Sequence, residues 1–284
     1  MKTADLHFHT KNSDGKHSTA EVLEMLKKSR AQDLGFAVLT DHDGVAGYQE
    51  FAEGVKDWWK PICASELSCT YEDPKFPKGS IELHLLMYGI DPAEKELQEK
   101  FEKFKEERRL RFFRICDRVK AAGYKIDPES IAKKHTGVLG RPHVADALVA
   151  AGAVKTRSEA FELFLGDGKP FDVKKWRFPL EDAVNYAKKF GCKTSIAHPG
   201  QYGFKEEILK RFKDMGVDAI EVYHPRHDPE NFRYYSECAK RLGFKISGGS
   251  DFHTFETDRV GDEPSLGRTQ YPLEEAKNFL GAMI

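Results

Sequence analysis

Short apolar runs and stretches with helical periodicity alternate along most of the 284-residue chain. The apolar runs are bounded by glycine, proline or acidic residues, as is typical of buried strands. The predicted strands lie within residues 4–10, 36–43, 60–68, 79–91, 193–200, 218–225 and 244–253. The predicted helices lie within residues 18–35, 47–58, 179–191, 205–216, 229–243 and 273–284. This alternation predicts an α/β fold, either a distorted seven-stranded (β/α)7 barrel or, as the alternative, an open doubly wound sheet.

The stretch from residue 92 to residue 178 departs from this alternation and is predicted to be helical. It opens with a long charged helix over residues 92–123, and three shorter helical stretches follow. We interpret residues 92–178 as an inserted helical subdomain that recognises substrate. Residues 1–91 and 179–284 would then form the barrel that carries the insertion.

The long helix of the insertion is rich in arginine between residues 100 and 120, which raises the question of nucleic-acid binding. Glutamates are interleaved with these arginines, and such a mixture is more typical of a solvated helix with i,i+4 ion pairs. The phenylalanines of this helix are predicted to be core residues rather than base-stacking residues; they are Phe101, Phe104, Phe112 and Phe113.

Composition narrows the classes of function. The chain has 45 basic and 46 acidic residues, so no overall charge attracts nucleic acid or an anionic membrane. Its five cysteines are odd in number and form no C-x-x-C pair, which predicts reduced thiols and a cytoplasmic location. We find no charged leader and no apolar run of membrane-spanning length, so no membrane is expected as a partner. Nothing in the sequence implies an obligate protein partner.

Residues with metal-binding side chains lie where the predicted strands end. The stretch DLHFHT places His7 and His9 two residues apart, and on a strand such residues share one face. Asp14 follows in the next loop, and similar residues close later strands in TDHD, ASELS, ELHLL, AHPG, VYHP and SDFH. In a barrel of alternating strands and helices the carboxyl ends of the strands meet at one mouth, where active sites are found.

Each of these residues alone could be a polar side chain on a half-buried strand, and for an isolated H-x-H that alternative is about as good as a ligand role. Chance placement of the whole set is implausible. The set comprises His7, His9, Asp14, His42, Glu66, His84, His198, Asp251 and His253. These ligands are too many for one ion, and imidazoles with carboxylates but no thiolate favour manganese, iron or zinc. The sequence therefore predicts two or three divalent metal ions (Mn²⁺, Fe²⁺ or Zn²⁺).

In this order and spacing, the segments DLHFHTKNSDG, TDHD, ASELS, ELHLLMYGID, AHPG and SGGSDFH resemble the PHP family, named for polymerase and histidinol phosphatase. The resemblance extends over essentially the whole chain. The segment GRPHVADALVAAGAVKTRSEAFELFLGDGKP also resembles the helical insert of PHP phosphoesterases that act on nucleotide phosphates. That subfamily includes a phosphatase that removes the 3′-phosphate from nucleoside 3′,5′-bisphosphates and a 5′-3′ exoribonuclease that trims short RNA.

The resemblance implies a distorted seven-stranded barrel that holds three metal ions. The implied ligands are His7, His9, Glu66 and Asp251 for the first ion, Glu66, His84 and His198 for the second, and Asp14, His42 and His253 for the third. In this arrangement Glu66 would bridge the first two ions.

Clustered divalent ions lower the pKa of an attacking water and neutralise charge on the transferring phosphoryl group. We therefore predict direct attack of a metal-bound hydroxide on the phosphate ester. Asp251 would belong to the catalytic centre, and either His253 or His224 would protonate the leaving oxygen.

Substrate recognition is predicted to come from the insert. Arg141 and His143 lie where a helix is expected to begin, and such an N-terminus can bind phosphate. Lys169 in GDGKP is a further candidate, and a structural ion pair is the alternative for Arg141.

The leading hypothesis is a metal-dependent phosphoesterase, a hydrolase of phosphoric esters, that releases the 3′-phosphate of nucleoside 3′,5′-bisphosphates. Its partners would be small nucleotide phosphates, and exonucleolytic cleavage of short RNA is the second candidate. A histidinol phosphate phosphatase is a third possibility within this class. A non-catalytic metal-binding interaction module is the alternative from another class, and it is disfavoured because such a module would not require the complete ligand set.

Overall fold

The computed structural model describes residues 1–76, 79–134, 139–174, 178–254, 266–267 and 269–284. The strands are β1 (Thr3–Asp5), β2 (Leu34–Ala37), β3 (Ala64–Glu72), β4 (Ser80–Tyr88), β5 (Lys193–Ile196), β6 (Ala219–Tyr223) and β7 (Lys245–Gly248). The helices around them are α1 (Thr19–Arg30), α2 (Tyr48–Val55), α7 (Leu180–Lys189), α8 (Pro199–Tyr202), α9 (Glu206–Met215), α10 (Pro229–Leu242) and α11 (Leu273–Leu280), with a 3₁₀ turn at Gly281–Met283. Between β4 and α7 lie α3 (Lys95–Ala121), α4 (Pro128–Lys134), α5 (Arg141–Ala150), α6 (Arg157–Ala160) and the π-helical segment η1 (Phe161–Leu165).

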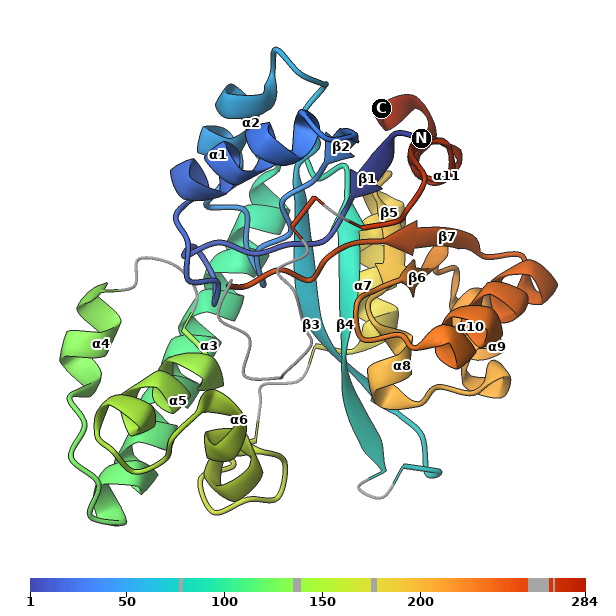
Figure 1. The fold of residues 1–284 in the computed structure, drawn as a ribbon. Helices are drawn as coiled ribbons and strands as arrows, with labels where there is room; N and C mark the ends of the chain where they lie inside the picture. Colours follow the sequence, from blue (N-terminus) through green and yellow to red (C-terminus); the bar gives the residue numbers. More distant parts are fainter. Residues whose placement is uncertain (77–78, 135–138, 175–177, 255–265, 268) are drawn as a thin grey trace.

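The strands pair in two sheets with helices packed around them (Figure 1). β1 and β2 form a parallel pair, and the other strands lie side by side in the order β3, β4, β5, β6, β7. β4 is antiparallel to β3 and to β5, whereas β5, β6 and β7 are parallel to one another. The connection from β3 to β4 is too short for a crossover helix, because a parallel pair needs a connection of about a dozen residues or more. These two strands can therefore pair only as a hairpin.

The predicted α/β class is confirmed, but strand pairing among the described residues does not close into a seven-stranded (β/α)7 barrel. Isolated bridges between Phe8 and Phe252 and between His42 and Glu66 join the two sheets instead. The ladders are interrupted because the residues that follow the strands bend away. Asp251, for example, has a left-handed backbone (φ 49°), which cannot continue a strand.

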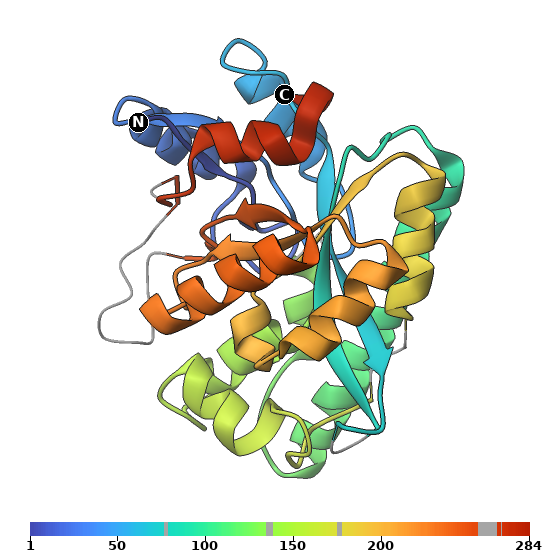
Figure 2. The ribbon, with the colours of Figure 1, turned by 90° about the vertical axis from the view of Figure 1, so that its right-hand side faces the viewer.

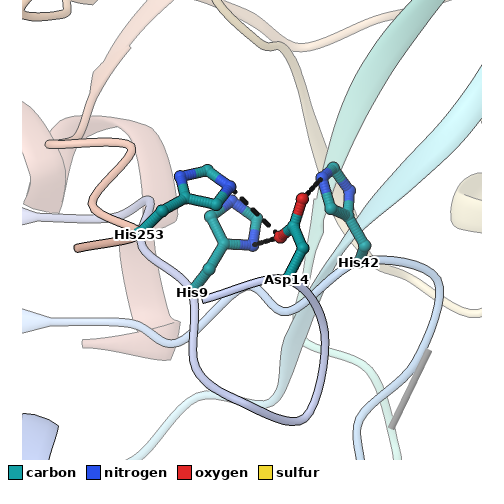
Figure 3. Close-up of side chains that lie close together, drawn as sticks. All are labelled: His9, Asp14, His42 and His253. Atoms are coloured by element: carbon teal, nitrogen blue, oxygen red, sulfur yellow. Dashed lines mark ion pairs between the residues drawn. The ribbon is translucent and has the colours of Figure 1, made fainter. Parts of the chain in front are cut away.

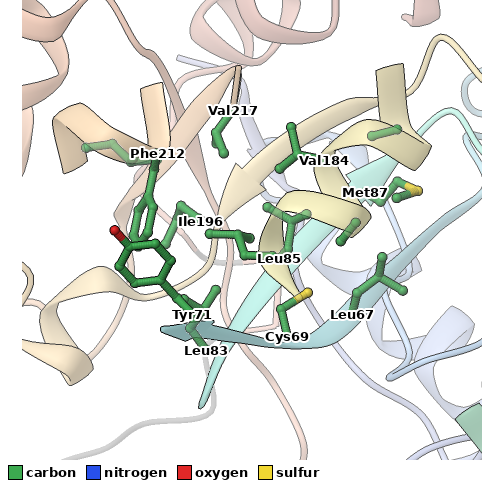
Figure 4. Packing of buried hydrophobic residues seen from close by; sticks show 14 of the residues in the cluster. Leu67, Cys69, Tyr71, Leu83, Leu85, Met87, Val184, Ile196, Phe212 and Val217 are labelled. Atoms are coloured by element: carbon green, nitrogen blue, oxygen red, sulfur yellow. The ribbon is translucent and has the colours of Figure 1, made fainter. Parts of the chain in front are cut away.

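The main hydrophobic core lies on one face of the larger sheet, where α7 and α9 cover it (Figure 4). Alternate residues of β3 and β4 face this core, since side chains along a strand alternate between the two faces. The residues of these two strands that face the core are Leu67, Cys69, Tyr71, Leu83, Leu85 and Met87. Figure 2 shows α9 and α10 side by side against the parallel part of the sheet. The opposite face of β3 and β4 carries the polar residues Glu66 and His84 beside Leu86 and Tyr88, which belong to a separate hydrophobic cluster.

The helices between β4 and α7 have a second core, drawn from residues 112–173. Phe101 and Phe104 are buried in the main core and Phe112 in this second core. Phe113 is partly buried against the second core. The prediction that these rings pack inside the protein is therefore confirmed.

All five cysteines are buried thiols outside any disulfide. Within the described part of the chain, no helix combines the length and the apolar character needed to span a bilayer.

Candidate metal centre

His7 and His9 lie on the extended segment that follows β1, and they share one face of it as the H-x-H spacing predicts. Leu6 and Phe8 on the opposite face are fully buried in hydrophobic clusters. The amide of Asp251 donates a hydrogen bond to the His7 carbonyl (2.7 Å), which brings a late segment of the chain against this early one. The apolar face anchors the segment and the polar face supplies ligands.

One ligand set comprises His7, His9, Glu66 and Asp251, the four residues predicted to hold the first ion. His7 Nε2 lies 3.2 Å from Glu66 Oε2 and 3.4 Å from Asp251 Oδ1. His9 Nε2 lies 3.1 Å and 3.5 Å from the same two oxygens. The side chains are at most 10% exposed, so two carboxylates and two imidazoles converge in a nearly dry space.

A second set comprises His9, Asp14, His42 and His253 (Figure 3). Asp14 lies at its centre: its Oδ1 is 3.1 Å from His253 Nε2 and its Oδ2 is 3.7 Å from His42 Nε2. Asp14 Oδ1 also lies 3.9 Å from His9 Nδ1. The three residues predicted for the third ion are therefore brought together, and His9 lies between this set and the first.

The third set comprises His42, Glu66 and His84. Glu66 Oε1 lies 2.8 Å from His84 Nδ1 and 3.2 Å from His198 Nε2. Glu66 Oε2 lies 3.2 Å from His42 Nδ1. Glu66 thus faces ligands of two sets with its two oxygens, as a carboxylate that bridges two ions would.

Hydrogen bonds on the outer side of the centre fix which nitrogen each imidazole presents inward. His253 Nδ1–H donates to the Asp251 carbonyl (2.8 Å), which leaves Nε2 directed at Asp14. His224 Nδ1 accepts from the Arg226 amide (3.1 Å), so the proton of a neutral His224 is on Nε2, 3.3 Å from Asp251 Oδ2. Such outer hydrogen bonds are characteristic of metal-binding histidines and their carboxylates.

The loop that carries Asp14 is held by Asp41, a residue whose function the sequence did not reveal. Asp41 Oδ1 accepts hydrogen bonds from the Thr10 amide and the Ser13 hydroxyl, and Oδ2 accepts one from the Thr10 hydroxyl, all at 2.7 Å. Asp41 was recognised only as an acidic strand end. Its side chain turns away from the ligands and closes the loop between His9 and Asp14.

Backbone geometry at the centre is unusual. His198 has a left-handed conformation (φ 31°), as does Asp251, and such conformations persist in residues other than glycine only where the surroundings enforce them. Gly249 lies against the first histidine, since a Cβ there would be 2.2 Å from the His7 Cβ. The chain therefore accepts local strain in order to bring these side chains together.

The electrostatic state of the centre favours bound cations. Burial raises the pKa of Asp14, Glu66 and Asp251, but the surrounding histidines lower each of them further, to well below the usual range. Burial lowers the pKa of His9, whereas hydrogen bonds to Asp251 and Glu66 raise it to about 10. Burial lowers the pKa of His42 to about 3, so this ring is neutral, and the proton on His9 offsets carboxylate charge in the metal-free protein until a divalent cation takes its place.

The donors present fit divalent transition metals. They are imidazoles and carboxylates without a thiolate, which suits manganese, iron and zinc. Asp14 Oδ1, His42 Nδ1 and His198 Nδ1 are buried without a hydrogen bond of good geometry to any described residue, although Asp14 Oδ1 lies 3.1 Å from His253 Nε2 and His42 Nδ1 lies 3.2 Å from Glu66 Oε2. Unsatisfied lone pairs at the centre of a ligand set are expected where an ion binds.

Comparison with known proteins identifies the chain. No family model matches it. A 3′,5′-nucleoside bisphosphate phosphatase from Chromobacterium violaceum is 32% identical to it over 267 residues, which cover 89% of this chain and 88% of that protein. The chain belongs to the PHP family of metal-dependent phosphoesterases. It is therefore a hydrolase of phosphate esters.

This PHP phosphoesterase is also similar to an exoribonuclease and to two solved structures. A 5′-3′ exoribonuclease from Haemophilus influenzae is 27% identical over 257 residues, covering 89% of this chain and 90% of that protein. A solved structure from C. violaceum, described as an amidohydrolase with bound sulfate, is 29% identical and superposes with a TM-score of 0.81 over 99% of this chain and 96% of that one. A Bifidobacterium adolescentis protein described as a metal-dependent phosphoesterase has the same fold, with a TM-score of 0.84 at 24% identity over 98% of this chain and 96% of its own.

The candidate metal centre of the phosphoesterase opens into a cleft of about 630 Å³. Candidate ligands that line it include Asp14, Glu66, His84 and Asp251, and its other lining residues come from β4, from the loop after β6 and from the helical segment between β4 and α7. The space is large enough for a nucleotide, since small-molecule sites typically measure about 300–1,000 Å³.

Two arginines line the cleft, and they differ in their hydrogen-bond partners. Arg141, a predicted substrate residue, donates to Asp167 Oδ1 (2.8 Å) and to the Leu165 carbonyl (3.2 Å), so it is engaged within the insert. Arg226, which the sequence did not single out, donates to Gln201 Oε1 (3.2 Å) and has no carboxylate partner among the described residues. No spacing rule marks Arg226, because it lies in an irregular loop after β6.

The other predicted substrate and catalytic residues occupy varied positions. His143 is buried in the insert, where its Nδ1 accepts from the Gly140 amide (3.0 Å), and Lys169 is exposed; neither lines the cleft. Their substrate-binding role stays a prediction. Of the two candidate proton donors, His253 lines the cleft and is 25% exposed, whereas the His224 side chain is 1% exposed.

Proposed function

We propose that this PHP phosphoesterase removes the 3′-phosphate from nucleoside 3′,5′-bisphosphates with the help of two or three divalent ions. The observation that carries the proposal is the pair of ligand sets that share Glu66 at the floor of a nucleotide-sized cleft. A carboxylate shared between two sets holds ions close together, as phosphoryl transfer at paired metals requires.

The proposed ligands follow the assignment that the PHP resemblance implies, which differs from the third set in taking His198, 3.2 Å from Glu66 Oε1, in place of His42. They are His7, His9, Glu66 and Asp251 for one ion, Glu66, His84 and His198 for another, and Asp14, His42 and His253 for a third. When bound, the ions would acidify a water molecule and neutralise charge on the phosphoryl oxygens. We propose that the two sheets and their bridges act as a distorted barrel around these ligands.

The proposed substrate class rests on the shape and charge of the cleft. Arg226 extends from the loop after β6 and can donate to a second phosphate while the first lies at the metal centre. Arg141, Phe161 and Gly166 form the facing wall, and we propose that residues 92–178 are an inserted subdomain whose task is to close this side. A relative named as a bisphosphate phosphatase and a neighbour with bound sulfate support this choice.

A second candidate is 5′-3′ exonucleolytic cleavage of short RNA. It is supported by the relative of that name in H. influenzae and by the cleft itself, which is open to solvent and could accept a chain end. We propose a cytoplasmic location for either activity, because all five cysteines are buried thiols.

The decisive experiment measures phosphate or nucleotide release by the manganese-loaded protein. The substrates are adenosine 3′,5′-bisphosphate, AMP, histidinol phosphate and a 5′-phosphorylated oligoribonucleotide. We expect rapid conversion of the bisphosphate to AMP, with slow or no release from the other two small molecules. Rapid shortening of the oligoribonucleotide with little bisphosphate hydrolysis would favour the exoribonuclease instead.

Two variants control this experiment. Asp251→Asn removes a ligand from the first set and is expected to lower the rate by several orders of magnitude. Glu275→Gln changes a half-buried carboxylate on α11, outside the cleft, and is expected to leave the rate unchanged. If the wild-type protein carries its full metal load and hydrolyses none of the four substrates, the proposed function is wrong.

A further inference from the structure

Glu221, on β6, is a fully buried carboxylate that lies behind the metal centre. It belongs to none of the ligand sets. Its Oε1 accepts a hydrogen bond from His7 Nδ1–H (3.0 Å), and its Oε2 accepts one from the backbone amide of His198 (2.7 Å). One side chain thus contacts two residues proposed to hold different ions.

The bond to His7 fixes the form of its imidazole. A neutral imidazole carries one proton, and a proton on Nδ1 leaves the lone pair on Nε2. His7 Nε2 is the nitrogen that faces Glu66 and Asp251. Glu221 therefore selects the tautomer of His7 that can bind an ion inside the first set.

The bond to His198 acts on its backbone instead. His198 has φ 31° and ψ 56°, a left-handed conformation that is uncommon outside glycine. The hydrogen bond from its amide to Glu221 secures this conformation, and the ring is then directed at Glu66 Oε1. A conformation of this kind persists only where surrounding contacts stabilise it.

We propose that Glu221 is a positioning residue that couples two metal positions, through the side chain of His7 and the backbone of His198. The inference rests on the ligand assignment proposed above. Glu221 itself contacts neither substrate nor ion in this role. Its effect is to make occupancy of both positions depend on one buried carboxylate.

Replacing the carboxylate by an amide tests this role because an amide offers one acceptor oxygen in place of two. If the oxygen of the introduced amide accepts from His198, its NH₂ group faces His7 and forces the His7 proton onto Nε2. If the amide adopts the opposite orientation, its NH₂ group faces the backbone N–H of His198, and two donors meet without an acceptor. In either orientation one metal position is impaired, and loss of such outer partners typically weakens metal binding about 10- to 100-fold.

The experiment compares Glu221→Gln, Glu221→Ala and the control Glu275→Gln with the wild type. Each protein is loaded with Mn²⁺ and dialysed, metal per chain is measured by elemental analysis, and the dissociation constant is measured by calorimetry. Circular dichroism checks that each variant is folded. We expect Glu221→Gln to lose at least one ion per chain and to bind Mn²⁺ no better than Glu221→Ala, while the control matches the wild type.

Comparing the Mn²⁺ affinities of Glu221→Gln and Glu221→Ala distinguishes a positioning role from a packing role. Glutamine preserves the volume of glutamate, so a residue that merely fills space would tolerate glutamine better than alanine. Wild-type metal content in Glu221→Gln, or clearly tighter binding by Glu221→Gln than by Glu221→Ala, would overturn the proposal. His7→Gln tests the underlying assignment separately: if it binds metal like the wild type, the ligand proposal fails whatever Glu221 does.

A measurement on the wild type covers the case in which the variants do not fold. In the zinc-loaded protein with ¹⁵N-labelled histidine, the proposal requires His7 to carry its proton on Nδ1. A His7 signal with the proton on Nε2 would contradict the proposal without any substitution of Glu221.

Discussion

Glu66 shows how much a single residue can be read from sequence. It was predicted as a ligand because an acid closes the apolar strand in ASELS, and its bridging role was implied by the PHP resemblance. The structure places it within 3.2 Å of histidines in each set that contains it. Glu221 and Asp41 were not predicted as parts of the centre. Each is a single acid beside an apolar run. Its function depends on the residues that it contacts in the folded protein, and the local sequence does not reveal those contacts.

Arg226 offers a test of substrate recognition at the residue scale. Arg226→Gln removes the guanidinium that has no carboxylate partner among the described residues, and we expect kcat/KM for adenosine 3′,5′-bisphosphate to fall about 10- to 100-fold. A hydrogen bond to a charged group contributes about 1.5–3 kcal/mol, which corresponds to this range. The loss should appear mainly in KM, as measured by steady-state phosphate release. Arg233→Gln, an exposed change on α10, is the control, and an unaltered KM in Arg226→Gln would rule out this role.

The protonation of the ligands predicts how metal binding depends on pH. His9 has a pKa of about 10, because hydrogen bonds to Asp251 and Glu66 outweigh the lowering by burial, so it holds a proton at neutral pH in the metal-free protein. A bound ion displaces that proton, and affinity should fall about tenfold per unit decrease of pH for each proton displaced. Calorimetric titration with Mn²⁺ at about pH 8 and about pH 6 checks this. Equal affinity at both values would mean that no proton is released.

At the scale of elements, α3 is tied to the segment that carries the ligand His42. Arg108 on α3 forms an ion pair with Asp43 and a hydrogen bond with the Ser68 hydroxyl, and Asp43 Oδ1 accepts from the Ser68 amide (2.6 Å). The sequence predicted α3 and its charged surface. It could not predict this contact, since residue 43 lies in the loop after β2 and residue 108 on α3, and no local spacing relates the two.

Removing this contact should loosen the attachment of the insert. Arg108→Gln leaves the buried Asp43 without its cation, and we expect the free energy of unfolding to fall by about 1–3 kcal/mol. Urea denaturation followed by circular dichroism measures the change. Arg109→Gln is the matched control on the same helix, because Arg109 is half exposed and should change stability by less than about 0.5 kcal/mol. Equal effects of the two variants would show that the Arg108 contact contributes nothing special.

The direction of β4 and the closure of the sheet differ from the prediction, and the connections between elements explain the difference. Seven strands were expected in a parallel barrel from their spacing, and the seven strands form, but the short link between β3 and β4 makes β4 antiparallel. Positions of apolar runs reveal where strands lie. Their direction depends on the length of each connection, and closure of the ladder depends on backbone conformation at single residues such as Asp251.

For the whole molecule, the proposed metal centre lies between the two sheets and draws residues from both. His7 and His9 follow the smaller sheet, whereas Glu66 and His84 belong to the larger one. Ions held by both groups would fasten one sheet to the other. Metal binding should therefore contribute to the stability of the folded chain as well as to its chemistry.

Metal removal tests this coupling. Dialysis against a chelator is expected to lower the melting temperature by about 5–10 °C, since an ion present at a hundred times its dissociation constant stabilises the folded state by about 2.7 kcal/mol. Differential scanning calorimetry before and after restoring Mn²⁺ measures the shift. Asp251→Asn should show a smaller shift than the wild type. An identical melting temperature with and without metal would mean that the ions do not join the sheets.

The approach of Asp251 to His7 also has a consequence for how the protein is made. Ribosomes release a chain from its amino end, so His7 and His9 leave the tunnel long before Asp251 and His253 are synthesised. The two ligand sets that contain these early histidines each need one of the late residues. An emerging chain therefore presents two histidines but not the complete pocket, and we expect metal loading to wait until the segment that carries Asp251 and His253 has been synthesised.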